Sequence, residues 1–390
     1  MDGARTQGHP AALAAVARMI RDGATHAILL TGPEGVGKTT LAQDLAAGLC
    51  CTADDPAARP CGDCRACRLV FADRHPDVHQ LAPEGVGRQI VIGGPGARTR
   101  GIRDLVADLA FAPVEGGARV AIVASADRMN EDAQGALLKT LEEPPAGVVI
   151  VLCADAEEPI LPTIRSRCRR IRLGPVATRE IEMILAEHGA ADPPLAARLA
   201  RVTAGRPGLA IRWAGEPEAL RARNELHRSL LDLTDARPAE RLTSVRVAAG
   251  AVSALTAVGE RTGPSRANPA VEPDPGPSDD SSMGSQAEGG GAGTSRTPAA
   301  ERRRAAEALV GLWSDVARDI TLCRLGLASD VRGLDLLDES TVLAAALETH
   351  VVTAFIERLG RAGLLLAGNV SPELVLDDLA LAWPRRVAAA

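Results

Sequence analysis

The sequence has few aromatic residues: three Phe, three Trp and no Tyr make up 2% of its 390 residues. Stacking of bases on aromatic side chains is therefore a poor explanation for any contact with nucleic acid, and the cores must be built from Leu, Val, Ile and Ala. A basic excess is also missing. Because the net charge is −6 at pH 7, the chain as a whole has no general attraction for phosphate backbones.

Long apolar runs are missing as well. No run approaches the length of about 18 residues that a membrane helix needs. The apolar patch 11–17 is followed at once by Arg18 and Arg21, without a cleavage site of small residues. We therefore expect no membrane span, no secretory signal and a cytoplasmic protein. In that compartment the eight cysteines are expected to be thiols or metal ligands rather than disulfides.

Residues 1–175 have the pattern of an α/β domain, in which short apolar runs alternate with helical stretches and glycine turns. The runs are Ala27–Leu30, Ile90–Ile92, Val120–Ala124 and Val148–Leu152. This alternation predicts a parallel sheet with crossover helices.

The rest of the chain is predicted to be helical. Residues 176–213 form short amphipathic helices that are broken by proline and glycine, and residues 214–390 follow as a longer helical region. An insert at 259–299 interrupts the second region. Because Gly, Pro, Ser and acidic residues dominate the insert, we expect it to be disordered.

A phosphate-binding motif, G-x-x-x-x-G-K-T, follows the first apolar run and opens a helical stretch. Its glycines let backbone N–H groups converge on phosphate oxygens. The lysine reaches the outer phosphates, and the hydroxyl of the next residue can ligate Mg²⁺. The motif therefore predicts an ATP/Mg²⁺ site. The residues expected there are Gly32, Gly35, Gly37, Lys38, Thr39 and Thr40.

Hydrolysis also requires carboxylates at the end of a neighbouring strand. The first two positions after the apolar run at 120–123 are Ala124 and Ser125, which can neither hold Mg²⁺ nor orient water. Asp127 is an alternative ligand, but it stands three residues after Ala124 and on the opposite face of the strand. We therefore expect little or no hydrolysis by this chain.

Five cysteines lie close together after the phosphate loop. Cys61, Cys64 and Cys67 form two overlapping C-x-x-C units, and Cys50 and Cys51 stand ten or eleven residues earlier. Four thiolates can surround one structural Zn²⁺ at about 2.3 Å. A redox pair and an iron–sulfur cluster are the alternatives. We prefer zinc in a module over residues 50–67, with Cys51 rather than Cys50 as the fourth ligand.

Two further motifs are the stretch ALLKTLEEPP at 136–145 and Ser166-Arg167-Cys168. Together with the phosphate loop and the cysteine module, in this order, they resemble the clamp-loader ATPase-fold subunits of bacterial DNA polymerase III. The resemblance covers about residues 8–175. It implies an AAA+ P-loop domain at 1–175 that carries the zinc module, a helical lid domain at 176–213 and a helical collar domain at 214–390.

The resemblance also implies a function in DNA replication, in a complex that loads the sliding clamp onto primed DNA. Tau/gamma subunits of this family carry an Asp-Glu pair where this chain has Ala124 and Ser125. The resemblance therefore favours the delta-prime type, with a tau/gamma-like ATPase motor as the alternative. The intact phosphate loop departs from many delta-prime subunits, so nucleotide binding and enzyme activity stay open.

In this family the arginine of the Ser-Arg-Cys motif reaches ATP that is bound by a neighbouring subunit. The resemblance gives Arg167 this role of an arginine finger acting in trans. Arg206, in the loop of the expected lid, is a candidate for nucleotide sensing. The implied partners are tau/gamma and delta subunits in a hetero-pentamer and, through the complex, the sliding clamp and primer-template DNA. A DNA-binding zinc module is disfavoured by the acidic net charge.

Overall fold

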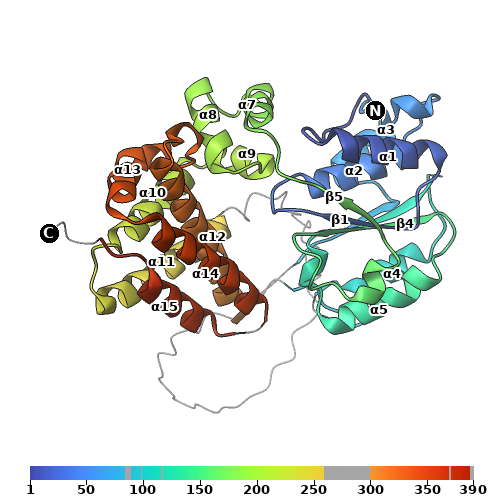
Figure 1. Ribbon diagram of the computed structural model, residues 1–390. Coiled ribbons are helices and arrows are strands. Elements are labelled where there is room, and N and C mark those ends of the chain that lie inside the picture. Colours follow the sequence, from blue (N-terminus) through green and yellow to red (C-terminus); the bar gives the residue numbers. More distant parts are fainter. Residues whose placement is uncertain (84–88, 98, 116, 259–298, 369, 387–390) are drawn as a thin grey trace, which may run out of the picture.

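The computed structural model describes residues 1–83, 89–97, 99–115, 117–258, 299–368 and 370–386. An α/β domain, a small helical unit and a helical bundle follow one another along the chain (Figure 1). The insert predicted at 259–299 lies outside the described residues, except for Ala299, with which a helix begins. Within the described ranges, no helix combines enough length with enough apolar character to span a membrane.

In the described part of the chain, five parallel strands form the centre of the α/β domain, in the order β2-β3-β4-β1-β5. The three middle strands are buried along their whole length, as expected for a parallel sheet that is covered on both faces. Because all strands run the same way, the loops that follow them gather at the carboxyl ends of the strands. In chain order the strands are β1 (Ala27–Thr31), β2 (Val78–Leu81), β3 (Arg119–Val123), β4 (Val148–Ala154) and β5 (Arg169–Arg172).

Helices cover both faces of this sheet, so the domain has three layers (Figure 1). One face packs against α1 (Pro10–Asp22), α2 (Lys38–Cys50) and α3 (Arg65–Phe71). The other face packs against α4 (Ile102–Leu109) and α5 (Glu131–Glu142). Alternate residues of the same strands enter the two cores, because successive strand side chains point to opposite faces. The predicted α/β fold is confirmed.

The small helical unit consists of α7 (Thr178–Glu187), α8 (Pro193–Val202) and α9 (Pro207–Gly215), which enclose a core of their own. A helical bundle follows, which confirms the predicted helical C-terminal region. Trp313, Phe355 and Trp383 pack together in its core, with ring centroids 4.6–5.7 Å apart. The bundle contains α10 (Pro217–Asp232), α11 (Pro238–Val258), α12 (Ala299–Arg324), α13 (Leu337–Ala346), α14 (Thr349–Ala367) and α15 (Pro372–Ala382).

Three strand assignments differ from the apolar runs of the sequence. β2 and β5 are absent from those runs because both are short edge strands with polar residues: β5 has three exposed arginines, and β2 has two half-buried polar side chains among its four residues. The prediction of a strand at Ile90–Ile92 is wrong. Ile90 makes only an isolated bridge to Met129, and the carbonyl oxygens of Val91 and Ile92 accept hydrogen bonds from the first residues of α4. The segment therefore supports a helix start instead of joining the sheet.

The first residues of the chain tie the cysteine module to α2. The N–H of Gly3 donates to the carbonyl oxygen of Pro60 at 2.8 Å. Further along, the two carboxylate oxygens of Asp44, a fully buried residue of α2, accept the N–H groups of Arg5 at 2.9 Å and Thr6 at 2.8 Å. Burial raises the pKa of Asp44, and these two donors partly offset that rise. The segment is thus held at both ends by hydrogen bonds that its backbone N–H groups donate, to a carbonyl oxygen at Gly3 and to the Asp44 carboxylate at Arg5 and Thr6.

Replacing Asp44 should therefore weaken the domain. Asp44→Ala leaves two N–H groups without an acceptor, so we expect it to lower the free energy of unfolding by about 2–4 kcal/mol. Asp2→Ala, at a side chain that is 80% exposed, is the control and should change it by less than about 0.5 kcal/mol. Urea unfolding measures both variants. Equal midpoints for Asp44→Ala and the wild type would contradict the assigned role.

Candidate nucleotide-binding and metal sites

The phosphate loop joins the end of β1 to the start of α2. Gly32, Gly35 and Gly37 all have positive φ angles, of 149°, 75° and 109°. A β-carbon at Gly32 would lie 2.2 Å from the carbonyl oxygen of Leu173, so only glycine fits there. Gly37 is the N-cap residue of α2 and, as a glycine, offers no side chain to the first helical N–H groups. The backbone therefore has the form of an anion site at a helix N-terminus.

Lys38 is turned inward and is 7% exposed. Its ammonium donates to the carbonyl oxygens of Gly32 at 2.7 Å and Pro33 at 2.9 Å, and to the carboxylate of Asp155 at 2.7 Å. Asp155 directly follows β4, which lies next to β1 in the sheet. Thr39 and Thr40, with Lys38, form the first turn of α2 and are half-buried. The lysine that the motif assigns to phosphate thus pairs with a carboxylate of its own chain.

The chain turns sharply after β3, where the motif of an active ATPase would carry its carboxylates. Ser125 has a left-handed backbone conformation, with φ of 57°, and a 3-10 turn follows from Ala126 to Arg128. This turn directs Asp127 toward β4, where its carboxylate accepts the N–H of Asp155 at 3.3 Å. Burial and the charge of Asp155 raise the pKa of Asp127. Among the described residues, Asp127 joins no group of three or more candidate metal ligands.

The small helical unit contacts the phosphate loop directly. The N–H of Gly208, at the start of α9, donates to the carbonyl oxygen of Gly35 at 2.8 Å. Arg206 stands just before α9, and its Nε donates to the carbonyl oxygen of Thr203 at 2.8 Å. Burial lowers the pKa of Arg206, and the charge of Asp315 on α12 opposes that shift. Arg206 is therefore half-buried and directly precedes the helix that touches the phosphate loop.

Arg167 and the phosphate loop lie at opposite ends of the parallel strands: Arg167 lies at the amino ends and the phosphate loop at the carboxyl ends. It follows the short helix α6 (Pro162–Arg165) and precedes β5, in which Arg169 is the register partner of Ile28 in β1. The phosphate loop begins four residues after Ile28, and a strand rises about 3.3 Å per residue, so about 13 Å of strand separates the two levels. Arg167 is thus directed to a different edge from the nucleotide site of its own chain.

The guanidinium of Arg167 is held at the surface by two contacts. It donates to the carboxylate of Glu142, the last residue of α5, at 2.8 Å and to the carbonyl oxygen of Thr163 at 2.9 Å. The Arg167 side chain is 37% exposed and that of Glu142 is 51% exposed. Exposed ion pairs of this kind contribute only about 0–1 kcal/mol, so the guanidinium is free to exchange one partner for another.

Four cysteines come together next to α2. The sulfur atoms of Cys51, Cys61, Cys64 and Cys67 all lie within 4.8 Å of one another. Those of Cys51 and Cys64 are 3.9 Å apart, close to the separation of about 3.8 Å expected for two ligands of one tetrahedral zinc. Cys50 lies outside this group, and its sulfur faces a backbone carbonyl oxygen at 3.8 Å. The cluster therefore has the donor number and the spacing of a closed metal site.

The backbone explains how these thiols converge. Cys64 is the N-cap residue of α3, and its sulfur accepts the N–H of Cys67 at 3.4 Å. The sulfur of Cys61 accepts the N–H of Cys64 at 3.4 Å in the same way. Burial by itself would raise the pKa of Cys64, but backbone donors from Cys67 and Thr52 outweigh it and lower the pKa to about 6. Burial raises the pKa of Cys51 and Cys67, so Cys64 ionises more easily than these two neighbours, and the thiolate is the form that binds a metal.

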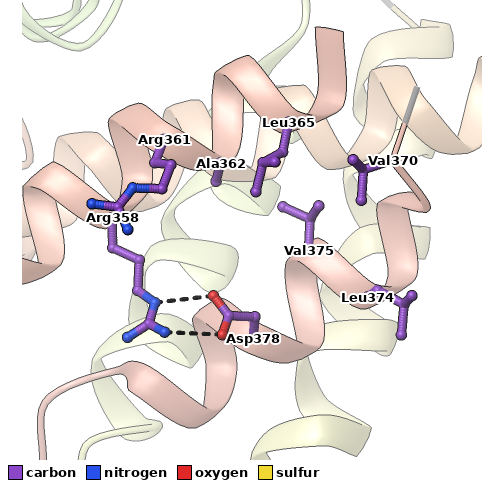
Figure 2. Close-up of a pocket in the computed structure, with 8 residues that line it drawn as sticks. All are labelled: Arg358, Arg361, Ala362, Leu365, Val370, Leu374, Val375 and Asp378. Atoms are coloured by element: carbon purple, nitrogen blue, oxygen red, sulfur yellow. Dashed lines mark hydrogen bonds and ion pairs between the residues drawn. The ribbon is translucent and has the colours of Figure 1, made fainter. Parts of the chain in front are cut away.

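A separate hollow of 170 Å³ lies between α14 and α15 (Figure 2). Arg358 closes one side through a bidentate pair with Asp378, at 3.0 and 3.1 Å. The rest of the lining is mostly apolar and contains none of the residues that the sequence motifs single out. We therefore do not assign the functional site to this hollow. The remaining lining residues are Arg361, Ala362, Leu365, Val370, Leu374 and Val375.

The environment of Asp127 gives a prediction about pH. Its raised folded-state pKa means that ionisation costs stability, and this cost grows as the pH rises from the unfolded value of about 3.8 through the folded value. Asp127→Asn keeps an acceptor for the N–H of Asp155 and removes the charge. We therefore expect a higher Tm than the wild type at pH 7 and a difference that shrinks as the pH falls toward 4.

Glu158→Gln, at an exposed carboxylate near β4, serves as the control and should leave the Tm unchanged at both pH values. The same thermal scans are repeated with Mg²⁺. If Mg²⁺ raised the Tm of the wild type but not of Asp127→Asn, Asp127 would be a magnesium ligand and the expectation would be wrong.

The family model and the relatives named below each cover less than half of the chain. Residues 8–177 match the family model described as DNA polymerase III, delta subunit. A DNA polymerase III subunit delta-prime of Pseudomonas aeruginosa is 42% identical over 143 residues, which cover 37% of this chain and 41% of the relative. The subunit delta-prime of Escherichia coli is 35% identical over 190 residues, which cover 48% and 53%. A subunit tau of Salmonella typhimurium is 34% identical over 178 residues, which cover 45% and 26%.

The chain thus spans about half the length of the curated delta-prime relatives that it matches. The matched region contains the phosphate loop, the cysteine cluster and Arg167. Through residues 8–177, which carry these motifs, the chain is similar to DNA polymerase III delta-prime subunits.

Proposed function

We propose that this chain is a clamp-loader subunit of the delta-prime type, which serves DNA replication in the cytoplasm by helping to load a sliding clamp onto primed DNA. One observation carries the proposal. Arg167 is exposed at the sheet edge opposite the phosphate loop, in a chain that has Ala124 and Ser125 where a motor subunit has its carboxylates. The family match over residues 8–177 supports this reading.

Arg167 has the chemistry of an arginine finger for a neighbouring subunit. A guanidinium stays charged, and its planar fork matches two phosphate oxygens at once. Its present partner, Glu142, holds it through an exposed pair that costs little to break. We infer that Arg167 gives up Glu142 and stabilises the nucleotide of an adjacent subunit, where a finger of this kind contributes about 10³–10⁵ in rate.

The phosphate loop of the chain fits a nucleotide through its backbone. The positive φ angles of its glycines and the N-terminus of α2 form a cradle for phosphate oxygens, and Lys38 and Thr39 stand where they would hold phosphate and Mg²⁺. A bound ATP would supply the phosphate charge that this cradle binds. Since no carboxylate follows β3 at Ala124 and Ser125, we infer binding without efficient turnover.

Zinc is the metal that best fits the four-cysteine cluster. Four thiolates select a soft or borderline metal, and a closed tetrahedral set is typical of structural Zn²⁺. The N-terminal segment crosses the same module and bonds it through Gly3 and Pro60. We infer that Cys51, Cys61, Cys64 and Cys67 bind Zn²⁺ and hold the module together.

The partners that we propose are tau/gamma and delta subunits in a hetero-pentamer and, through that complex, the sliding clamp and primer-template DNA. The intact phosphate loop and the similarity to a subunit tau favour one alternative, an ATPase motor of the same complex. The motor reading needs a magnesium ligand after β3. Asp127, the acid nearest to that position, instead faces the backbone of Asp155.

The arginine-finger proposal is tested in a reconstituted loader. We expect Arg167→Ala to remove the turnover of the neighbouring site and so to lower the DNA- and clamp-stimulated ATPase rate. Lys38→Ala should lower it much less. Arg169→Ala removes an exposed charge two residues away and is the matched control. Size-exclusion chromatography checks assembly. If Lys38→Ala abolished turnover while Arg167→Ala were silent, the chain would be a motor.

The zinc proposal is tested by elemental analysis of anaerobically purified protein. We expect about one equivalent of zinc in the wild type and in Cys50→Ser, because the Cys50 sulfur lies outside the cluster. Cys64→Ser should lose the metal and loosen residues 50–67, since metal binding contributes directly to the folding of such a module. A wild-type content below about half an equivalent would count against zinc.

A further inference from the structure

The Lys38 ammonium has no donor left for a phosphate in this structure. An ammonium carries three N–H donors. All three are used within the chain, by Gly32 at 2.7 Å, Pro33 at 2.9 Å and Asp155 at 2.7 Å. Two of these acceptors are neutral carbonyl groups of the loop itself, whereas the third is a carboxylate. Asp155 is therefore the group that neutralises the charge of the phosphate-loop lysine.

The order of the strands explains why this carboxylate is available. β4 lies between β3 and β1, so the residue that follows β4 stands between the end of β3 and the phosphate loop. The backbone N–H of Asp155 is in turn held by Asp127 at 3.3 Å, which ties the loop after β4 to the loop after β3. Two carboxylates thus lie at the same end of the sheet as the phosphate loop, and one of them is bound to Lys38.

We propose that Asp155 sets the nucleotide affinity of this chain by acting as an internal substitute for phosphate at Lys38. The phosphates of ATP or ADP can bind the Lys38 ammonium only when its ion pair with Asp155 breaks. The freed carboxylate of Asp155 then lies near the negative charge of the nucleotide. The proposal rests on the nucleotide site proposed above. It explains how a complete phosphate loop coexists with a subunit that need not bind nucleotide to act through Arg167.

The loop after β4 also offers a matched control. Glu157 stands two residues after Asp155, and its carboxylate accepts from the hydroxyl of Thr31 at 3.2 Å and pairs with Arg170 at 3.5 Å. It carries the same charge on the same loop but is bound to these partners rather than to Lys38. Glu157→Gln therefore measures the general effect of removing one negative charge from this region.

Isothermal titration with ATP and with ADP, each with Mg²⁺ and with EDTA, tests the proposal on the full-length chain. We expect Asp155→Asn to bind nucleotide at least about tenfold more tightly than the wild type, because the charge that competes for Lys38 is gone. Glu157→Gln should bind like the wild type. Asp155→Ser is a second variant of smaller volume and should behave like Asp155→Asn. Thermal unfolding confirms that each variant is folded.

An unchanged or weaker affinity in both folded Asp155 variants would overturn the proposal. Equal tightening by Glu157→Gln would overturn it too, because the effect would then be general electrostatics. Turnover is measured on the same samples to keep the two proposals apart. Tighter binding without turnover supports both, whereas tighter binding with turnover supports the role of Asp155 and contradicts a non-hydrolysing subunit. If the proposal for Asp155 fails, the proposed role of Arg167 is unaffected, since Arg167 lies at the other end of the strands.

Discussion

All strands of the described sheet run in the same direction. This single constraint places the proposed nucleotide site and Arg167 at opposite ends of the strands. The loops after β1, β3 and β4 meet at one edge and bring together Lys38, Asp127 and Asp155. The segment before β5 reaches the other edge and carries Arg167. An arginine at that edge is kept by the strands from the phosphate loop of its own chain, which is the placement that the proposed role at a neighbouring chain needs.

At the carboxyl ends of the strands, the positive and negative side chains of the chain compensate one another. Lys38 neutralises Asp155, whose N–H is held by Asp127, and the N–H of Gly208 holds the carbonyl oxygen of Gly35 from the side of the helical unit. A buried lysine requires such a partner, since an unpaired charge away from water is costly. The phosphate loop is therefore stable as a structural element, which is consistent with a subunit that contributes through a surface arginine.

Short-range sequence patterns predicted much of the site, whereas long-range pairs were missed. The glycines of the phosphate loop and the spacing of Cys61, Cys64 and Cys67 are local signals, since a turn or a metal loop fixes them within a few residues. The pairing of Lys38 with Asp155 spans 117 residues and follows only from the strand order. β2 and β5 were missed because edge strands need no apolar run. The apolar segment 90–92 was mistaken for a strand because burial alone does not distinguish a strand from a segment that supports a helix.

The central claim is that this chain assists hydrolysis at a neighbour and performs little of its own. ATP binding and ATP turnover measured on one purified sample, first alone and then with a tau/gamma-type motor subunit, test it most directly. The account predicts negligible turnover by the isolated chain and a turnover rate for the mixture above that of the motor subunit alone. Steady turnover by the isolated chain, at a rate comparable with that of the mixture, would contradict it.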